Sequence, residues 1–218
     1  MTPQLGLTLS AIAFLGTHFL LSHPLRGPLV RAAGEGPFRI LYTVVALVTF
    51  GAMIHFYSVI GREPPLWTAG DALWIVASLL IWLGSILFVG SFVHNPALPG
   101  AKRPAGPPGG VFRITRHPMM WSFAIWAAVH LTVIGMPKAL VFDGAIILLA
   151  LGGSAAQDSK KRQLMGEDWH DWTAQTGFVP FSRGVGNPGL VALVGGTLLF
   201  FVATWAHPVP AGFWRWIG

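Results

Sequence analysis

The stretch ALWIVASLLIWLGSILFVGSFV, residues 72–93, decides the fold class of this chain. It runs for 22 residues without a charged side chain, and about 20 apolar residues suffice to cross the hydrocarbon core of a bilayer as a helix. A helix also satisfies its own backbone polar groups, as a lipid environment requires. The stretch therefore predicts a membrane-spanning helix.

Five further apolar stretches flank this one along the chain. The six predicted spans are residues 3–21, 38–60, 72–93, 119–135, 140–157 and 188–206. The fourth and fifth are separated only by residues 136–139, where Pro137 interrupts the helix, so we expect a helical hairpin. The pattern predicts an all-α integral membrane protein, a six-transmembrane helical bundle that forms a single domain over residues 1–218.

The composition agrees with a membrane protein and excludes several soluble classes. Hydrophobic residues make up 53% of the 218 residues and charged residues only 10%, whereas a soluble domain carries roughly 25% charged residues. The net charge of +6 does not indicate nucleic-acid binding, because the basic residues lie between apolar runs and not on one solvated face. The chain has no cysteine, which excludes disulfides and thiolate metal sites.

Lys and Arg are concentrated in alternate connections between the predicted spans. The first, third and fifth connections hold Arg26, Arg31, Arg39, Lys102, Arg103, Arg113, Arg116, Lys160, Lys161, Arg162 and Arg183, and the other side holds Arg62, Lys138 and Arg215. Because basic loops stay in the cytoplasm, we expect these three connections to be cytoplasmic and both termini to lie on the outer side of the lipid bilayer. No basic region precedes the first span, so we expect that span to remain as an anchor.

Two of the predicted cytoplasmic connections have distinctive compositions. Residues 94–117 are rich in Pro and Gly, including Pro99 and Pro104, and cannot be helical throughout. Residues 158–187 begin as an amphipathic stretch, which predicts a cytoplasmic helix that continues from the fifth span or lies beside it. Asp158, Glu167, Asp168 and His170 form either a solvated helix face or a rim over a cofactor, with Trp169 and Phe181 packed beneath.

The interiors of the predicted spans hold no Lys or Arg, and the candidate functional side chains that remain in their apolar depth are the histidines His18, His55 and His130. Asp71 and Asp143 are predicted at span ends, so we expect no carboxylate-based proton relay. A buried histidine is either a metal or haem ligand or a hydrogen-bond partner between helices. We expect water near the outer surface to satisfy His55, whereas His18 and His130 lie deeper. Small residues near His130, namely Ala124, Ala127 and Ala128, either allow close helix packing or leave a flat slot.

The most specific motif is Thr115-Arg116-His117-Pro118 at the start of the fourth span. Proline is favourable at the first position of a helix, and the positive end of that helix suits a carboxylate, phosphate or propionate. The alternative interpretation is that Arg116 and His117 simply mark the membrane border.

These motifs, taken together and in order over about residues 10–183, resemble the NnrU family. The matching segments are HFLLSHPLR (18–26), GE (34–35), FRILY (38–42), HNPALP (94–99), ITRHPM (114–119), Trp126, His130, Asp158, GEDW (166–169), Thr176 and PF (180–181). The resemblance implies a link to denitrification, that is, to nitric oxide and nitrite reduction.

The NnrU family is in turn similar to 15-cis-zeta-carotene isomerase, a membrane enzyme that carries haem b. That similarity implies haem b held by His18 and His130, with Arg116 and His117 near a propionate, and nitric oxide or a polyene as the small molecule bound. The isomerases have a cysteine three residues before the second histidine, where this chain has Ala127. Carotene isomerisation by exchange of the iron ligand is therefore not expected.

Three alternatives stay open at this stage. The Arg-His-Pro motif, the hairpin and the charged helix also resemble isoprenylcysteine and phospholipid methyltransferases, which implies an S-adenosylmethionine site. Those enzymes usually carry two Glu after the hairpin, but Asp158 is the single acid in residues 157–162 here. The family association also allows a non-enzymatic assembly factor with a respiratory reductase as partner. A non-haem iron or zinc site of His18, His55 and His130 is the last alternative.

Overall fold

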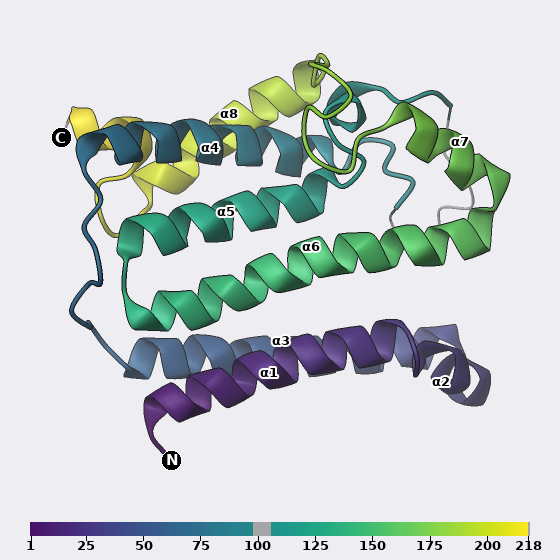
Figure 1. Cartoon of the computed structure of the whole chain (residues 1–218), viewed down its shortest axis with the longest axis horizontal. Helices are drawn as coiled ribbons and strands as arrows, with labels where there is room; N and C mark the ends of the chain where they lie inside the picture. Colours follow the sequence, from purple (N-terminus) through teal and green to yellow (C-terminus); the bar gives the residue numbers. More distant parts are fainter. Residues whose placement is uncertain (98–105, 218) are drawn as a thin grey trace. The chain divides into compact units, whose positions relative to one another are not determined.

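A computed structural model describes residues 1–97 and 106–217 of the chain (Figure 1). Within these residues all regular structure is helical, with eight α-helices and two 3-10 helices. Lys102, Arg103, Pro99 and Pro104, which contribute to the predictions for the third connection, lie outside the described residues. The chain divides into two compact units, Met1–Thr68 with His130–Leu149, and Ala69–Val129 with Ala150–Gly218.

Each of the six predicted spans falls on one helix. The helices are α1 (Pro3–Ser22), α3 (Glu35–Val59), α4 (Asp71–Gly90), α5 (Pro118–Ile134), α6 (Pro137–Met165) and α8 (Leu190–Trp205). Four of these helices in the described part, α1, α3, α4 and α6, are long and apolar enough to cross a membrane, whereas α5 and α8 have 17 and 16 residues. The helical architecture is thus confirmed, while the count of six spans and their orientation stay predictions.

The break between α5 and α6 lies where the sequence predicts it. Only Gly135 and Met136 separate the two helices, and Pro137 is the first residue of α6, a position where its missing N–H costs nothing. The charged stretch beyond the fifth predicted span is helical in two pieces, because α6 continues to Met165 and α7 (Glu167–Gln175) follows.

In the first unit, α1 runs beside α3 (Figure 1). Their buried core, to which α6 also contributes, consists of Leu7, Ala11, Phe14, Met53, Phe142 and Ala145. The short helix α2 (Arg26–Ala33) joins α3 through Gly34, whose φ of +86° suits a residue without a Cβ. The Glu35 carboxylate ties this corner together, because it accepts hydrogen bonds from Arg26 at 2.8 Å and from Arg39 at 3.2 Å.

In the second unit, α4 and α8 lie side by side (Figure 1). Gly196 of α8 permits this approach, since a Cβ there would lie 2.5 Å from the Ile86 Cα of α4. Small residues at such contacts are typical of helices packed in membranes. A second core packs η1 (Gly110–Arg113) and α7 against these helices, and it consists of Ile86, Leu87, Val111, Phe112, Ile114, Trp169, Trp172 and Ala192. The 3-10 helix η2 (Gly212–Trp216) contacts both α4 and α8.

Large apolar side chains stay exposed along several helices, which agrees with a lipid environment. Leu47 of α3, Leu79 of α4 and Leu198 of α8 are each about 60% exposed. Contiguous apolar surface of this kind is rare on soluble monomers.

Candidate functional site

The Thr115-Arg116-His117-Pro118 motif leads into α5 and is held by several hydrogen bonds. Pro118 is the first residue of the helix, as the sequence predicts. Thr115, which is fully buried, donates from its hydroxyl to the Phe178 carbonyl at 2.7 Å and accepts from the His117 backbone N–H at 3.3 Å. The motif is thereby fixed to the segment that follows α7.

Arg116 and His117 share one carboxylate, that of Asp158 in α6. Arg116 Nε and Nη2 lie 2.8 and 2.7 Å from Asp158 Oδ2, and His117 Nε2 lies 2.9 Å from Asp158 Oδ1. The His117 side chain has no exposed surface, and those of Asp158 and Arg116 are 9% and 14% exposed. Charge-assisted hydrogen bonds of this length are among the stronger ones in proteins.

The same cluster anchors the segment 176–178. Arg116 donates from Nη1 to the Thr176 carbonyl at 3.1 Å and from its backbone N–H to the Gly177 carbonyl at 2.8 Å. The Phe178 ring lies 5.3 Å both from the Arg116 guanidinium and from the His117 ring. The cluster is therefore well suited to hold three chain segments together, and its acid, base and guanidinium are already engaged with one another. The buried Nδ1 of His117 has no hydrogen-bond partner in the described part of the chain.

The ring of His18 is held in one orientation by a hydrogen bond to its own helix. Its Nδ1 lies 2.7 Å from the Phe14 carbonyl oxygen. A carbonyl oxygen only accepts, so Nδ1 carries the proton and Nε2 keeps its lone pair. No hydrogen bond from Nε2 to the described residues is found. The ring is half-buried between aromatic neighbours, with centroids 4.4 Å from Phe14 and 5.4 Å from Tyr42.

The other two histidines differ from His18 in their surroundings. His130 is half-buried in α5 and belongs to the same compact unit as His18. His55 is exposed on α3 with its ring 5.2 Å from that of Phe56, in keeping with the expectation that solvent satisfies it. Residues 1–97 and 106–217 contain no group of three or more His, Asp or Glu that could hold a metal ion. The three-histidine metal site is therefore not formed.

The small residues around His130 are mostly packed within the protein. Ala124 and Ala127 are 4% and 0% exposed, whereas Ala128 is exposed. The close-packing interpretation therefore holds for Ala124 and Ala127.

The predicted acid and histidine patch divides into a buried and an exposed part. Asp158 is buried in the cluster with Arg116, whereas Glu167, Asp168 and His170 are exposed. Trp169 is completely buried, as predicted for the layer beneath, but Phe181 is 41% exposed. The prediction for Phe181 was wrong, because this residue occupies a turn with φ of +64°.

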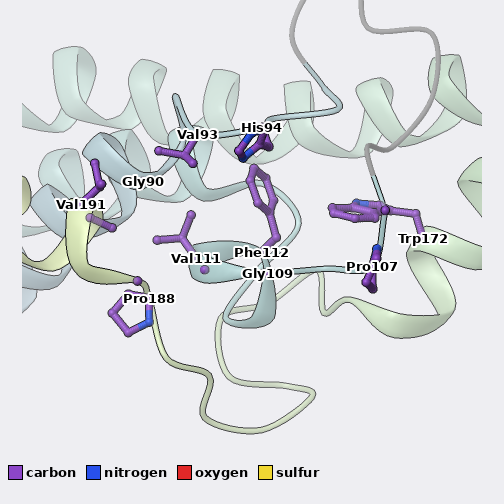
Figure 2. A pocket seen from close by; sticks show the side chains of 14 residues that line it. Gly90, Val93, His94, Pro107, Gly109, Val111, Phe112, Trp172, Pro188 and Val191 are labelled. Carbon is purple, nitrogen blue, oxygen red and sulfur yellow. The ribbon is translucent and has the colours of Figure 1, made fainter.

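A cavity of about 360 Å³ lies in the second unit, away from these residues (Figure 2). Its walls come from the end of α4, η1, α7 and the start of α8, and include Gly90, His94, Phe112, Trp172 and Val191. None of the site residues predicted from the sequence lines it. A neighbouring depression of about 240 Å³ shares Trp172 and exposes Asp168 and Asp171.

Comparison with known families gives a clear result over nearly the whole length of the chain. The family model described as NnrU protein matches residues 6–214. The chain belongs to the NnrU family. No curated protein and no solved structure matches it.

In this NnrU chain, sequence reasoning missed the partners of Asp158. The sequence left Asp158 either on a solvated helix face or in a rim over a cofactor, whereas its partners are Arg116 and His117, which precede it by about forty residues. One signal was present, since Asp158 is the only acid in residues 157–162, directly after an apolar run. An acid in that place needs a cation to be buried.

The Asp158 contacts also weigh against a cofactor amine at this position. Both carboxylate oxygens already accept hydrogen bonds from within the chain, one from Arg116 and one from His117. The NnrU chain thus has no free acid where the methyltransferases carry their pair of Glu.

Proposed function

We propose that this NnrU protein binds haem b in the membrane, and that His18, through Nε2, and His130 are the residues that would hold the iron. The single observation that carries the proposal is the 2.7 Å contact between His18 Nδ1 and the Phe14 carbonyl. Histidine ligands of metals nearly always donate their second ring N–H to such an acceptor, which fixes the tautomer and raises the basicity of the ligating nitrogen.

The side chains around His18 are aromatic and apolar, as the binding of an apolar porphyrin ring requires. Phe14 and Phe50 lie with ring centroids 5.4 Å apart, and Phe50 and Phe142 with centroids 5.9 Å apart, so aromatic side chains continue from His18 into the core of the unit. Bound haem would supply one-electron redox chemistry and a site for a diatomic ligand. His18 would orient the iron, and the apolar rings around it would exclude water.

The biological setting follows from family membership and is part of the same proposal. We infer an inner-membrane protein with six spans and both termini periplasmic, associated with the reduction of nitric oxide or nitrite. The ligand is then nitric oxide or a hydrophobic molecule such as a polyene, and a respiratory reductase is the partner. A pull-down from denitrifying cells that recovers no reductase subunit would remove the partner from this proposal.

The deciding experiment is an absorption spectrum of freshly extracted protein that has not been reconstituted with haem. We expect a Soret band in the wild type, its loss or shift in His18→Ala and in His130→Ala, and no change in His55→Ala. His55 is the matched control because it is exposed on α3 and makes only a ring contact with Phe56. A Soret band of unchanged position and intensity in both His18→Ala and His130→Ala would refute the assignment.

A further inference from the structure

Asp143 is a buried acid that the proposed haem site does not use. It lies in α6 six residues after Pro137, and only 2% of its surface is exposed. The sequence predicts Asp143 at a span end, and it does lie near the start of α6. The structure shows in addition that its side chain is buried.

The neighbours of Asp143 along α6 are apolar. Phe142 and Ala145 belong to the buried core, and Val141 and Ile146 pack against it. The Asp143 carboxyl makes no hydrogen bond and no ion pair with the described residues. Among the eight acids of the chain, Glu35, Asp71 and Asp158 are paired with arginines, and Glu167, Asp168 and Asp171 are exposed. Asp143 is the buried acid without a partner.

Tyr57 is the titratable group that the structure links to both Asp143 and Glu63, and Lys138 lies beside Tyr57. Both Asp143 and Glu63 lie close enough to act electrostatically on the Tyr57 hydroxyl. The Tyr57 ring lies 5.1 Å from that of Phe142, which precedes Asp143 in α6.

Lys138 is already engaged elsewhere and cannot neutralise Asp143. Its ammonium donates to the carbonyls of Tyr57 and Gly61 and lies 4.2 Å from the centre of the Tyr57 ring. Its backbone N–H donates to Glu63 Oε2 at 2.8 Å. An ionised Asp143 would therefore have no cation as partner and very little contact with water, since only 2% of its surface is exposed, and such a state costs several kcal/mol.

A buried acid that forms no ion pair and no hydrogen bond with the described residues costs free energy on folding. Its presence therefore indicates a functional role. Ionisable residues inside membrane helices are rare, and they commonly mark pathways for protons, ions or substrates. Here the proton is the ligand that the surroundings fit, because binding it removes the uncompensated charge. The half-buried Glu63 and the Lys138 end of α6 provide the polar side of the same cluster.

We propose that Asp143 is a proton-binding site of the first unit, which exchanges its proton with water through the cluster of Tyr57, Glu63 and Lys138. The resting group is the neutral acid. It gives one proton to the Glu63 carboxylate or to a water molecule there, is left as a carboxylate, and takes one proton back by the reverse step. Such a site would supply protons to a reaction that consumes them within the membrane. The proposal does not depend on bound haem.

Infrared spectroscopy of the whole protein in lipid nanodiscs tests the proposal, since a neutral carboxyl has a carbonyl band that a carboxylate lacks. We expect such a band at neutral pH, its downshift in heavy water, its loss in Asp143→Asn and its retention in Asp71→Asn, a matched acid at the exposed start of α4. We also expect Glu63→Gln to slow the downshift several-fold. The absence of a neutral-carboxyl band, or a band that never shifts in heavy water, overturns the proposal.

A chemical probe assigns the band if Asp143→Asn does not fold. Dicyclohexylcarbodiimide reacts with neutral carboxyl groups in apolar surroundings, and peptide mapping of the labelled wild type locates the adduct. We expect it on Asp143. An adduct on another acid with Asp143 unlabelled assigns the band elsewhere and overturns the proposal.

Discussion

Replacement of Asp158 by alanine removes the carboxylate that Arg116 and His117 share, and its cost can be worked out from the contacts. The change deletes the acceptor of two Arg116 contacts of 2.7–2.8 Å and of one His117 contact of 2.9 Å. The Arg116 side chain is only 14% exposed and that of His117 is not exposed at all. Removing one partner of a buried pair costs about 3–5 kcal/mol, because the remaining charge stays buried. We expect Asp158→Ala to lose stability in the lower part of that range, since water can reach part of the guanidinium.

Thermal unfolding in a mild detergent measures this loss, and Glu35→Ala provides the matched control. Glu35 also accepts from two arginines, but its side chain is 40% exposed, and exposed pairs contribute little. Hydrogen exchange adds a local test, because the Arg116 amide donates to Gly177 and the Phe181 amide donates to Ile114. Both amides should lose protection in Asp158→Ala. Equal unfolding temperatures for Asp158→Ala and Glu35→Ala, with both amides still protected, would refute the reasoning.

Two further substitutions test packing and hydrogen bonding in the second unit. Gly196→Ala should lower the unfolding temperature because its Cβ would lie 2.5 Å from the Ile86 Cα. The control is Gly144→Ala, whose Cβ would have nothing within 4 Å and which should be neutral or stabilise by up to about 1 kcal/mol. Equal effects of the two substitutions on the unfolding temperature would contradict the close approach of α4 and α8. Thr115→Val should cost about 1–3 kcal/mol because it leaves the Phe178 carbonyl and the His117 N–H without the hydroxyl. Thr115→Ser keeps that hydroxyl and should retain most of the stability, and a serine variant as unstable as the valine variant would count against the hydrogen bonds.

The positions of the helices could be predicted because hydropathy and length directly determine where a membrane helix lies. Residues 72–93 correspond to α4 at Asp71–Gly90, and residues 188–206 correspond to α8 at Leu190–Trp205. The ends differ where polar residues can also be helical. Helix α3 starts at Glu35, before the apolar stretch, because Arg26 and Arg39 compensate that acid.

The partners within the candidate sites could not be predicted, because separation along the sequence gives no distance in space. Arg116 and Asp158 are brought together by the packing of α5, α6 and the segment after α7, and no local pattern encodes that contact. The burial of Asp143 was missed for a different reason. Hydropathy averages over a window and cannot show that one polar residue near the end of a helix faces a core of Phe142 and its neighbours.

A haem propionate could bind Arg116 and His117 only in place of the Asp158 carboxylate, which already accepts hydrogen bonds from both. A propionate is a carboxylate, like the side chain of Asp158. Exchanging one for the other at Arg116 would therefore add no new kind of hydrogen bond or ion pair. Asp158 is held in place by α6 and has already lost its freedom on folding, whereas a propionate would lose that freedom on binding. We therefore expect Arg116 to stay with Asp158 and not to hold a propionate.

Weakening Asp158 tests this argument directly. If a propionate competes for Arg116, Asp158→Asn, which keeps the shape but removes the charge, should raise the affinity for haem, and Asp158→Asn combined with Arg116→Gln should cancel the gain. The control is Asp171→Asn, an exposed acid of α7. Haem titrations followed by the Soret band measure these three variants and Arg116→Gln alone. Haem affinity that falls in Arg116→Gln alone while Asp158→Asn leaves it unchanged would show that Arg116 serves the propionate without competition from Asp158.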